Sequence, residues 1–204
     1  RVEVLAEDFR LAGAEKTGVD DVPVTIYIEG DGRAYLPTGA VSDNPTPVNP
    51  VGLMLALGDK GTGKAVYLAR PCQFVEKGVH PECRTPALYT EGRWSRKVVA
   101  AYVQAVLPYI RNGRVRLVGY SGGGYLALAV AGQLPGDTVA EVVTVAGNLD
   151  PNGLHKLHGV AALLDVAPLL YDVLAEIPQV HYVGTRDKVV KPAVRQMYMA
   201  AAGA

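Results

Sequence analysis

Residues 114–134, RVRLVGYSGGGYLALAVAGQL, constrain the fold of this 204-residue chain more than any other stretch. The short apolar run Val115–Val118 contains β-branched residues, which is typical of a buried strand. A glycine, a tyrosine, Ser121 and three further glycines follow, and an alanine- and leucine-rich run from Tyr125 to Leu134 then predicts a helix. The stretch therefore predicts a strand, a tight turn and a helix, with one serine in the turn.

Residues 119–123 fit the pattern G-x-S-x-G, in which a serine lies on a strained strand-to-helix turn and its hydroxyl projects from the sheet. Glycine suits both outer positions because side chains there would collide with the strand and the helix. The first N–H groups of the helix, Gly122 among them, can stabilise an oxyanion. Ser121 is therefore a candidate nucleophile. The alternative is a glycine-rich turn of another α/β protein, such as one that binds phosphate.

The composition is that of an ordinary globular protein, with 49% hydrophobic and 20% charged residues. The length favours a single domain over residues 1–204. A formal net charge of 0 gives no electrostatic basis for binding nucleic acid or an anionic membrane, and no apolar run is long enough to span a bilayer. Because the chain opens at Arg1 without a methionine, we expect a processed or trimmed product.

The two cysteines, Cys72 and Cys83, lie close together in the loop-like stretch PCQFVEKGVHPEC. With no other cysteine and no nearby set of ligands, a structural zinc site is not expected. We favour a local disulfide that closes a loop, which would imply an oxidising compartment. The alternative is a pair of reduced thiols in a cytosolic enzyme.

Strand and helix patterns alternate along the chain. Residues 1–12 predict an early strand and residues 13–22 a polar turn; further strands are predicted at 24–28, 65–69, 115–118, 139–146 and 180–183, and helices at 51–57, 94–110, 125–134, 160–175 (broken near Pro168) and 192–201. This alternation predicts an α/β fold with a mainly parallel central sheet and helices on both faces. Candidate functional residues fall at the carboxyl ends of its strands, where such sheets bind ligands: Asp31, Ser121, Asp150 and Asp187.

The stretch from Gly58 to Ala65 matches the phosphate-binding pattern G-x-x-x-x-G-K. A nucleotide site also needs Ser or Thr at the next position, where this chain has Ala65, and a helix after the lysine, where AVYLARP predicts a strand. Nucleotide binding is therefore disfavoured, and a glycine-rich turn between helix and strand explains the pattern.

A serine hydrolase also needs a second oxyanion donor, an acid and a histidine base. The glycine-rich loop after the strand at 24–28 is the place for the donor, the backbone N–H of Asp31 or a neighbour, although a plain turn is an alternative. Asp187, after the last predicted strand, is the favoured acid, and Asp150 is the second candidate. Either aspartate could instead only cap a turn.

The base is missing from its usual place, because no histidine follows Asp187. His181 lies inside a predicted strand, and His80 lies in the cysteine-containing loop. His155 and His158 lie in a predicted loop that could overhang the site. We hypothesise that the chain lacks its natural C-terminal end, with a last strand and its histidine beyond Ala204.

The segments IYIEGDG, YLARPCQ, GYSGGG, VAGNLD and HYVGTRDKVV resemble those of a group of bacterial exported α/β-hydrolases, many of them lipoproteins. The similarity covers roughly residues 20–195. It implies an α/β-hydrolase fold with Ser121 as nucleophile, Asp187 as acid, the Glu29–Gly32 loop on the oxyanion side and a bridge between the two cysteines. It further implies a periplasmic or secreted protein, tethered to a membrane through an N-terminal segment absent from this chain.

These observations favour a serine hydrolase of the esterase or lipase type, which cleaves an ester or related acyl bond of a small molecule through an acyl-enzyme on Ser121. The chemistry requires no cofactor or metal. The alternative is a catalytically inactive binding or scaffold protein of the same fold. A histidine within hydrogen-bond reach of Ser121 would distinguish the two.

Overall fold

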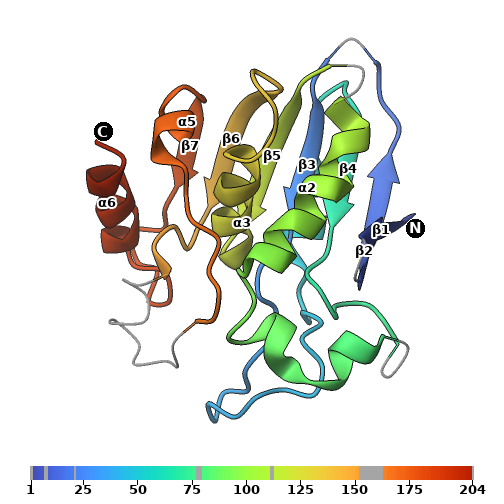
Figure 1. Ribbon diagram of the computed structural model, residues 1–204, viewed down its shortest axis with the longest axis vertical. Coiled ribbons are helices and arrows are strands. Elements are labelled where there is room, and N and C mark those ends of the chain that lie inside the picture. The colour runs from blue at the N-terminus through green and yellow to red at the C-terminus, as the bar shows by residue number, and fades with distance from the viewer. Residues whose placement is uncertain are drawn as a thin grey trace.

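The computed structural model contains one seven-stranded sheet with helices on both faces (Figure 1). It describes residues 2–6, 9–20, 22–76, 80–110, 113–151 and 163–203. The strands are β1 (Val2–Ala6), β2 (Phe9–Lys16), β3 (Val24–Ile28), β4 (Ala65–Leu68), β5 (Val115–Tyr120), β6 (Val139–Val145) and β7 (Gln179–Tyr182). The α-helices are α1 (Val51–Gly58), α2 (Arg96–Ile110), α3 (Gly122–Ala131), α5 (Tyr171–Ala175) and α6 (Pro192–Ala201), and two short 3₁₀ helices lie at Pro81–Arg84 and Pro86–Tyr89.

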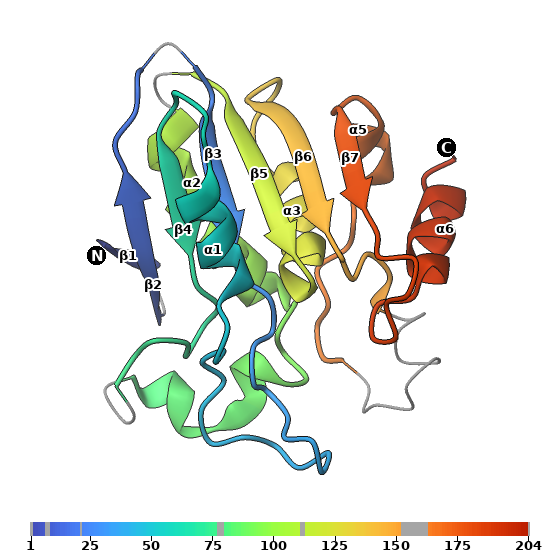
Figure 2. The same cartoon turned by 180° about the vertical axis from the view of Figure 1, so that it is seen from behind.

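The strand order is β1-β2-β4-β3-β5-β6-β7. The strands from β4 to β7 are parallel, whereas β1 pairs with β2 and β2 with β4 in antiparallel fashion. The register aligns Ile28 with Gly119, and Tyr120 with Val145. The carboxyl ends of the parallel strands therefore meet at one edge of the sheet, at the bottom of Figures 1 and 2.

The helices divide between the two faces because the chain reverses its direction of travel across the sheet. After β3 it crosses through α1 to β4, and then returns through α2 to β5 on the other side of β3. Helices α2 and α3 cover the face seen in Figure 1, and α1 covers the face seen in Figure 2. This reversal creates a switch point between β3 and β5, where open α/β sheets commonly bind ligands.

Two apolar clusters fill the space between sheet and helices. The larger, under α2 and α3, includes Leu117, Leu126 and Trp94, which have no exposed surface. The smaller, under α1, includes Tyr27, Tyr67 and Val118. The predicted α/β architecture with a mainly parallel sheet is confirmed, and the strand at 24–28 has the predicted bounds.

Three predicted segments differ from the structure. Residues 1–12 were expected to form one early strand, but β1 and the start of β2 pair there as antiparallel strands. Residues 13–22 were expected to form a polar turn, but β2 continues to Lys16 because its backbone pairs with β4 as far as Ala65. Residues 160–175 were expected to be mostly helical, but of the described part only Tyr171–Ala175 forms a helix. Residues 164–167 instead bond to the segment before α2: Leu164 donates to Glu91, and Ala167 donates to Trp94.

No helix of the described residues is long and apolar enough to cross a lipid bilayer.

Candidate active site

Ser121 lies between β5 and α3 in a backbone conformation that residues with a side chain rarely adopt, with φ 50° and ψ −119°. Two glycines make this conformation possible. A Cβ on Gly119 would lie 2.2 Å from the Gly123 carbonyl oxygen, and a Cβ on Gly123 would lie 2.5 Å from the carbonyl oxygens of Glu29 and Ile28. The strand and the helix can therefore approach this closely only without side chains at both positions.

Hydrogen bonds hold the turn from both sides. The Ser121 N–H donates to the Val145 carbonyl at 3.0 Å, which ties the turn to the end of β6. The Ser121 carbonyl accepts from the N–H groups of Gly124 and Asn148, both at 2.9 Å. Trp94, which is fully buried, donates from Nε1 to the Gly122 carbonyl at 2.9 Å. The serine is thus presented by a turn whose backbone is anchored to β6, to the loop after it and to the segment before α2.

The loop after β3 lies directly against Ser121. A Cβ on Gly30 would lie 3.2 Å from Ser121 Cβ, and a Cβ on Gly122 would lie 2.1 Å from Asp31 Oδ1. Among the described residues, the backbone N–H groups of Asp31 and Gly122 have no hydrogen-bond acceptor. The structure therefore brings together the serine and both segments that the sequence predicts as oxyanion donors.

The Asp31 carboxylate is neutralised by two buried arginines. Arg70 Nη1 lies 2.6 Å from Asp31 Oδ1, and Arg93 Nε lies 3.3 Å from Asp31 Oδ2. The two arginine side chains are only 3% and 7% exposed. A bare carboxylate beside Gly122 would oppose negative charge developing there, so the two cations remove an electrostatic obstacle to an oxyanion.

Glu29 is a buried carboxylate that sequence reasoning did not single out beyond its place in the loop. It is 1% exposed and accepts hydrogen bonds from the backbone of Gly30, Gly52 and Leu53 and from the Tyr67 hydroxyl. It thus satisfies the free N–H groups at the start of α1 and stabilises the positive end of the helix dipole. Burial first, and then the Glu29 charge, raise the pKa of Tyr67, so this hydroxyl stays a donor.

A cleft of about 370 Å³ opens over the serine. Its walls come from the loop after β3, the proline-rich segment 47–49, the β5–α3 turn and the loop after β7. Val48 and Val189 are 73% and 66% exposed at this cleft, and Arg33 and Asn49 are polar lining residues. The cleft can therefore contact both apolar and polar parts of a small molecule.

Known proteins with a similar fold are found among solved structures, whereas no family model and no curated protein matches the chain. A candidate α/β hydrolase of unknown function from Agrobacterium tumefaciens has 15% identity and a TM-score of 0.60 over 99% of this chain and 78% of its own. The chain has an α/β-hydrolase fold. An α/β serine hydrolase without a lid from Xanthomonas campestris has 17% identity and a TM-score of 0.55, over 98% and 77% of the two chains. Prolyl oligopeptidase B from Galerina marginata has 16% identity and a TM-score of 0.64, but this chain spans only 30% of its length.

Asp187 follows β7, at the same edge of the α/β-hydrolase sheet as Ser121. Its Oδ1 accepts from the N–H groups of Val189 and Val190 at 2.8 and 3.0 Å, so it caps a turn. Burial, then the charges of Glu29 and Asp187, raise the pKa of Tyr120, the residue before the serine. Burial is the main cause that raises the pKa values of Tyr125 in α3 and Tyr171 in α5. The charge of Asp150 raises both further, after the contribution of Tyr171 in the case of Tyr125.

The structure describes two of the four histidines, His80 and His181. His181 lies in β7, where Nδ1 is 2.9 Å from Thr144 Oγ1 and the ring packs on Tyr198, and burial lowers its pKa to about 4. His80 precedes the first 3₁₀ helix. His155 and His158 lie outside the described residues. Within the described part of the chain, no side chain forms a hydrogen bond with the Ser121 hydroxyl.

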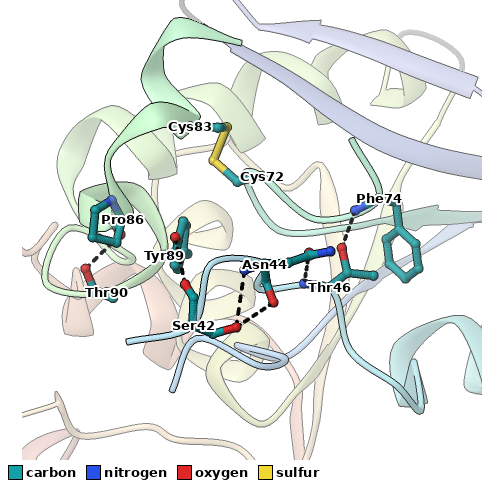
Figure 3. Close-up of a disulfide and its surroundings, with 9 residues drawn as sticks. All are labelled: Ser42, Asn44, Thr46, Cys72, Phe74, Cys83, Pro86, Tyr89 and Thr90. Carbon is teal, nitrogen blue, oxygen red and sulfur yellow. Dashed lines mark hydrogen bonds between the residues drawn. A yellow bond between two sulfur atoms is a disulfide. The ribbon is translucent and has the colours of Figure 1, made fainter. Parts of the chain in front are cut away.

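Cys72 and Cys83 form a disulfide, with 5.6 Å between their Cα atoms, as predicted (Figure 3). The described residues contain no group of three or more His, Cys, Asp or Glu side chains placed to hold a metal ion. The stretch Gly58–Ala65, which matches the phosphate-binding pattern, forms the turn between α1 and β4, as predicted. There Asp59 accepts from the Gly61 N–H and the Tyr27 hydroxyl.

Sequence reasoning missed Arg93, Trp94 and the role of Gln73. Each contacts a residue far away in the chain: Arg93 contacts Asp31, Trp94 donates to Gly122 and Gln73 donates to Gly30. The one local signal was the position of Gln73, a polar residue directly after Cys72. A single sequence does not reveal which distant partner such residues contact.

Proposed function

We propose that this protein is a serine hydrolase that cleaves an ester or related acyl bond of a small molecule. The observation that carries the proposal is the backbone of Ser121, with φ 50° and ψ −119° next to N–H groups that have no acceptor in the described part of the chain. Such strain costs about 1–3 kcal/mol and tends to occur at functional sites. The α/β serine hydrolase from Xanthomonas campestris with a similar fold is consistent with the proposal.

In the proposed reaction, a base removes the Ser121 hydroxyl proton as the oxygen attacks the acyl carbon. The resulting oxyanion accepts hydrogen bonds from the backbone N–H groups of Gly122 and Asp31. The alcohol leaves with the proton, and Ser121 keeps the acyl group. A water molecule then gives up a proton to the same base and attacks the acyl carbon. The bond to Ser121 breaks, the base returns the proton to the serine oxygen, and the carboxylic acid leaves.

The base and acid remain proposals. Asp187 Oδ1 is occupied by two backbone donors, and its Oδ2 has no partner among the described residues, so it could orient an imidazole ring. His155, His158 or a histidine beyond Ala204 would supply that ring. An inactive scaffold is the second candidate, favoured by the absence of a histidine bonded to Ser121 in the described residues.

Hydrolysis of p-nitrophenyl acetate and butyrate tests the proposal. We expect Ser121→Ala to lower kcat at least about a thousand-fold, because the nucleophile cannot be replaced by the rest of the site. Thr38→Ala, which removes an exposed hydroxyl outside the cleft, should leave kcat unchanged. Equal activity of wild type and Ser121→Ala would exclude Ser121 as nucleophile, and an inactive wild type would favour the scaffold.

We also infer export, because disulfides persist mainly in oxidising compartments and Cys72 and Cys83 are paired. Acid-quenched protein from its native cells should show no free thiol towards a maleimide. Two reactive thiols would contradict export.

A further inference from the structure

We propose that Gln73 is a positioning residue for the oxyanion hole. Its side-chain amide holds the Gly30–Asp31 peptide in the orientation that leaves the Asp31 N–H available to the substrate oxyanion. This inference rests on the proposed serine hydrolase function. It assigns a role in catalysis to the loop of residues 70–89, which contains the disulfide and which we call the cysteine loop.

The contacts of Gln73 single it out. The residue has no exposed surface, and Nε2 donates to the Gly30 carbonyl at 3.0 Å. Its Oε1 accepts from the Arg70 N–H at 3.1 Å, which fixes which end of the amide faces Gly30. Its own N–H donates to the Arg70 carbonyl at 3.1 Å. Both ends of the side chain are therefore satisfied, and the amide cannot turn without losing two buried hydrogen bonds.

A hydrogen bond to the Gly30 carbonyl also controls the Asp31 N–H. The two groups belong to one planar peptide unit and point in opposite directions across it. Holding the oxygen on one side therefore fixes the direction of the N–H on the other. That control is needed because glycines flank the unit: Gly30 and Gly32 allow backbone rotations that other residues resist, and Gly32 has φ 63°.

The same peptide is held through the Asp31 side chain. Arg70 Nη1 binds the Asp31 carboxylate at 2.6 Å, and Arg70 Nη2 donates to the Arg93 carbonyl at 2.6 Å. Arg70 and Gln73, three residues apart, thus both bind the Gly30–Asp31 unit. Arg70 binds the Asp31 side chain, and Gln73 binds the Gly30 carbonyl. On its Gly30 side the unit faces Ser121, because a Cβ on Gly30 would lie 3.2 Å from Ser121 Cβ.

The cysteine loop is itself braced on both sides of Gln73. Cys72, the residue before it, is bonded to Cys83. Phe74, the residue after it, donates from its N–H to Thr46 Oγ1 at 2.8 Å (Figure 3). Figure 3 also shows the Tyr89 hydroxyl at the end of the loop, which donates to the Ser42 carbonyl at 3.0 Å. The side chain that holds the oxyanion peptide is therefore carried by a backbone with little freedom, which is what preorganisation of an oxyanion hole requires.

Two variants test the proposal. Gln73→Met keeps nearly the same shape but removes both side-chain hydrogen bonds, and Gln73→Glu at pH 8 keeps the acceptor for Arg70 and removes the donor to Gly30. Gln104→Met, on the exposed side of α2, is the matched control. The assay measures kcat and KM for p-nitrophenyl butyrate, and Ki for a trifluoromethyl ketone, whose adduct with the serine carries an oxyanion.

We expect both Gln73 variants to lower kcat by about 10- to 100-fold, somewhat less than the loss of a direct oxyanion donor. KM should stay within about three-fold, and Ki should rise by about the same factor as kcat/KM falls, because the lost stabilisation belongs to the transition state. Unchanged kcat/KM and Ki in both Gln73 variants, or a change in KM alone, would overturn the proposal. Loss of folding in both variants, seen by near-UV circular dichroism, would assign Gln73 to stability and overturn it too.

Hydrogen exchange separates this inference from the proposed function. Exchange of the amides in residues 29–33 should be faster in both Gln73 variants than in wild type and Gln104→Met, whether or not the protein hydrolyses esters. An inactive wild type with faster exchange in the variants would contradict the hydrolase and leave the positioning contact intact. An active wild type with unchanged exchange in the variants would contradict the positioning role alone.

Discussion

Ser121 can occupy its tight turn because the neighbouring glycines carry no Cβ atom. Gly119 and Gly123 face backbone carbonyl oxygens and other main-chain atoms at distances that no Cβ tolerates. These glycines could be predicted from the sequence because the contact is local, between the strand and helix that flank one turn. The need for glycine at position 122 could not be predicted in this way, because the space left by its missing Cβ is taken by Asp31, which lies 91 positions earlier in the chain.

Replacing Gly119 by alanine tests the close approach. The new Cβ would lie 2.2 Å from the Gly123 carbonyl oxygen, and because that neighbour is backbone it cannot simply rotate away. We expect a loss of about 2 kcal/mol or more in the free energy of unfolding, measured with urea. Gly58→Ala, whose Cβ would have no neighbour within 4 Å, is the control and should change the unfolding free energy little. Equal stabilities of the two variants would contradict the close approach of strand and helix at this turn.

His181 makes a second prediction at this scale. Burial, and then the charge of Arg195, lower its pKa to about 4 from the ordinary 6.5. Between these values the unfolded chain binds the proton more readily, so the stability that neutral His181 contributes is present above pH 6.5 and is lost as the pH falls towards 4. We expect the urea midpoint of wild type to fall more between pH 7 and pH 4.5 than that of His181→Gln. An equal fall of the urea midpoint in both proteins would show that His181 does not contribute to the loss of stability at low pH.

At the scale of elements, the central parallel strands could be predicted because they are short and mostly apolar runs, and nearly every residue of β3 and β4 is buried. The end of β2 could not, since Glu15 and Lys16 are polar residues typical of a turn, and they join the sheet through backbone pairing with β4. The helix expected over 160–175, with a break near Pro168, forms only at Tyr171–Ala175 in the described part of that range. Pro168 disfavours helical geometry in the residue before it, and the Ala167 carbonyl accepts instead from the buried Tyr125 hydroxyl at 2.7 Å.

The disulfide is the element-scale feature with the largest expected effect on stability. It joins residues 11 positions apart, so its removal should cost about 3 kcal/mol of unfolding free energy by the loop-entropy argument. The Cys72→Ala/Cys83→Ala double variant should show this loss in urea denaturation. Dithiothreitol should destabilise wild type similarly and leave the double variant unchanged. Wild type that is equally stable with and without reductant would show that the bond does not stabilise the fold.

At the scale of the whole molecule, the candidate site lies where the chain reverses its direction across the sheet, between β3 and β5. The order of strands and helices predicted this edge as the site, and the predicted Asp31, Ser121 and Asp187 all lie there. The hydrogen bonds of Arg70 and Gln73 to the loop after β3 could not be predicted, because they join residues 39 and 43 positions apart. Such contacts depend on how the finished sheet brings two loops together, and no local pattern encodes them.

The most direct test of the central claim, that Ser121 is an activated nucleophile, is intact-protein mass spectrometry after treatment with a fluorophosphonate. Such probes react with serines whose hydroxyl is activated by a neighbouring base. We predict a single adduct, located on Ser121 by peptide mapping and absent from Ser121→Ala, with Thr38→Ala labelled like wild type. No adduct on wild type, or an adduct of equal yield on Ser121→Ala, would contradict the claim.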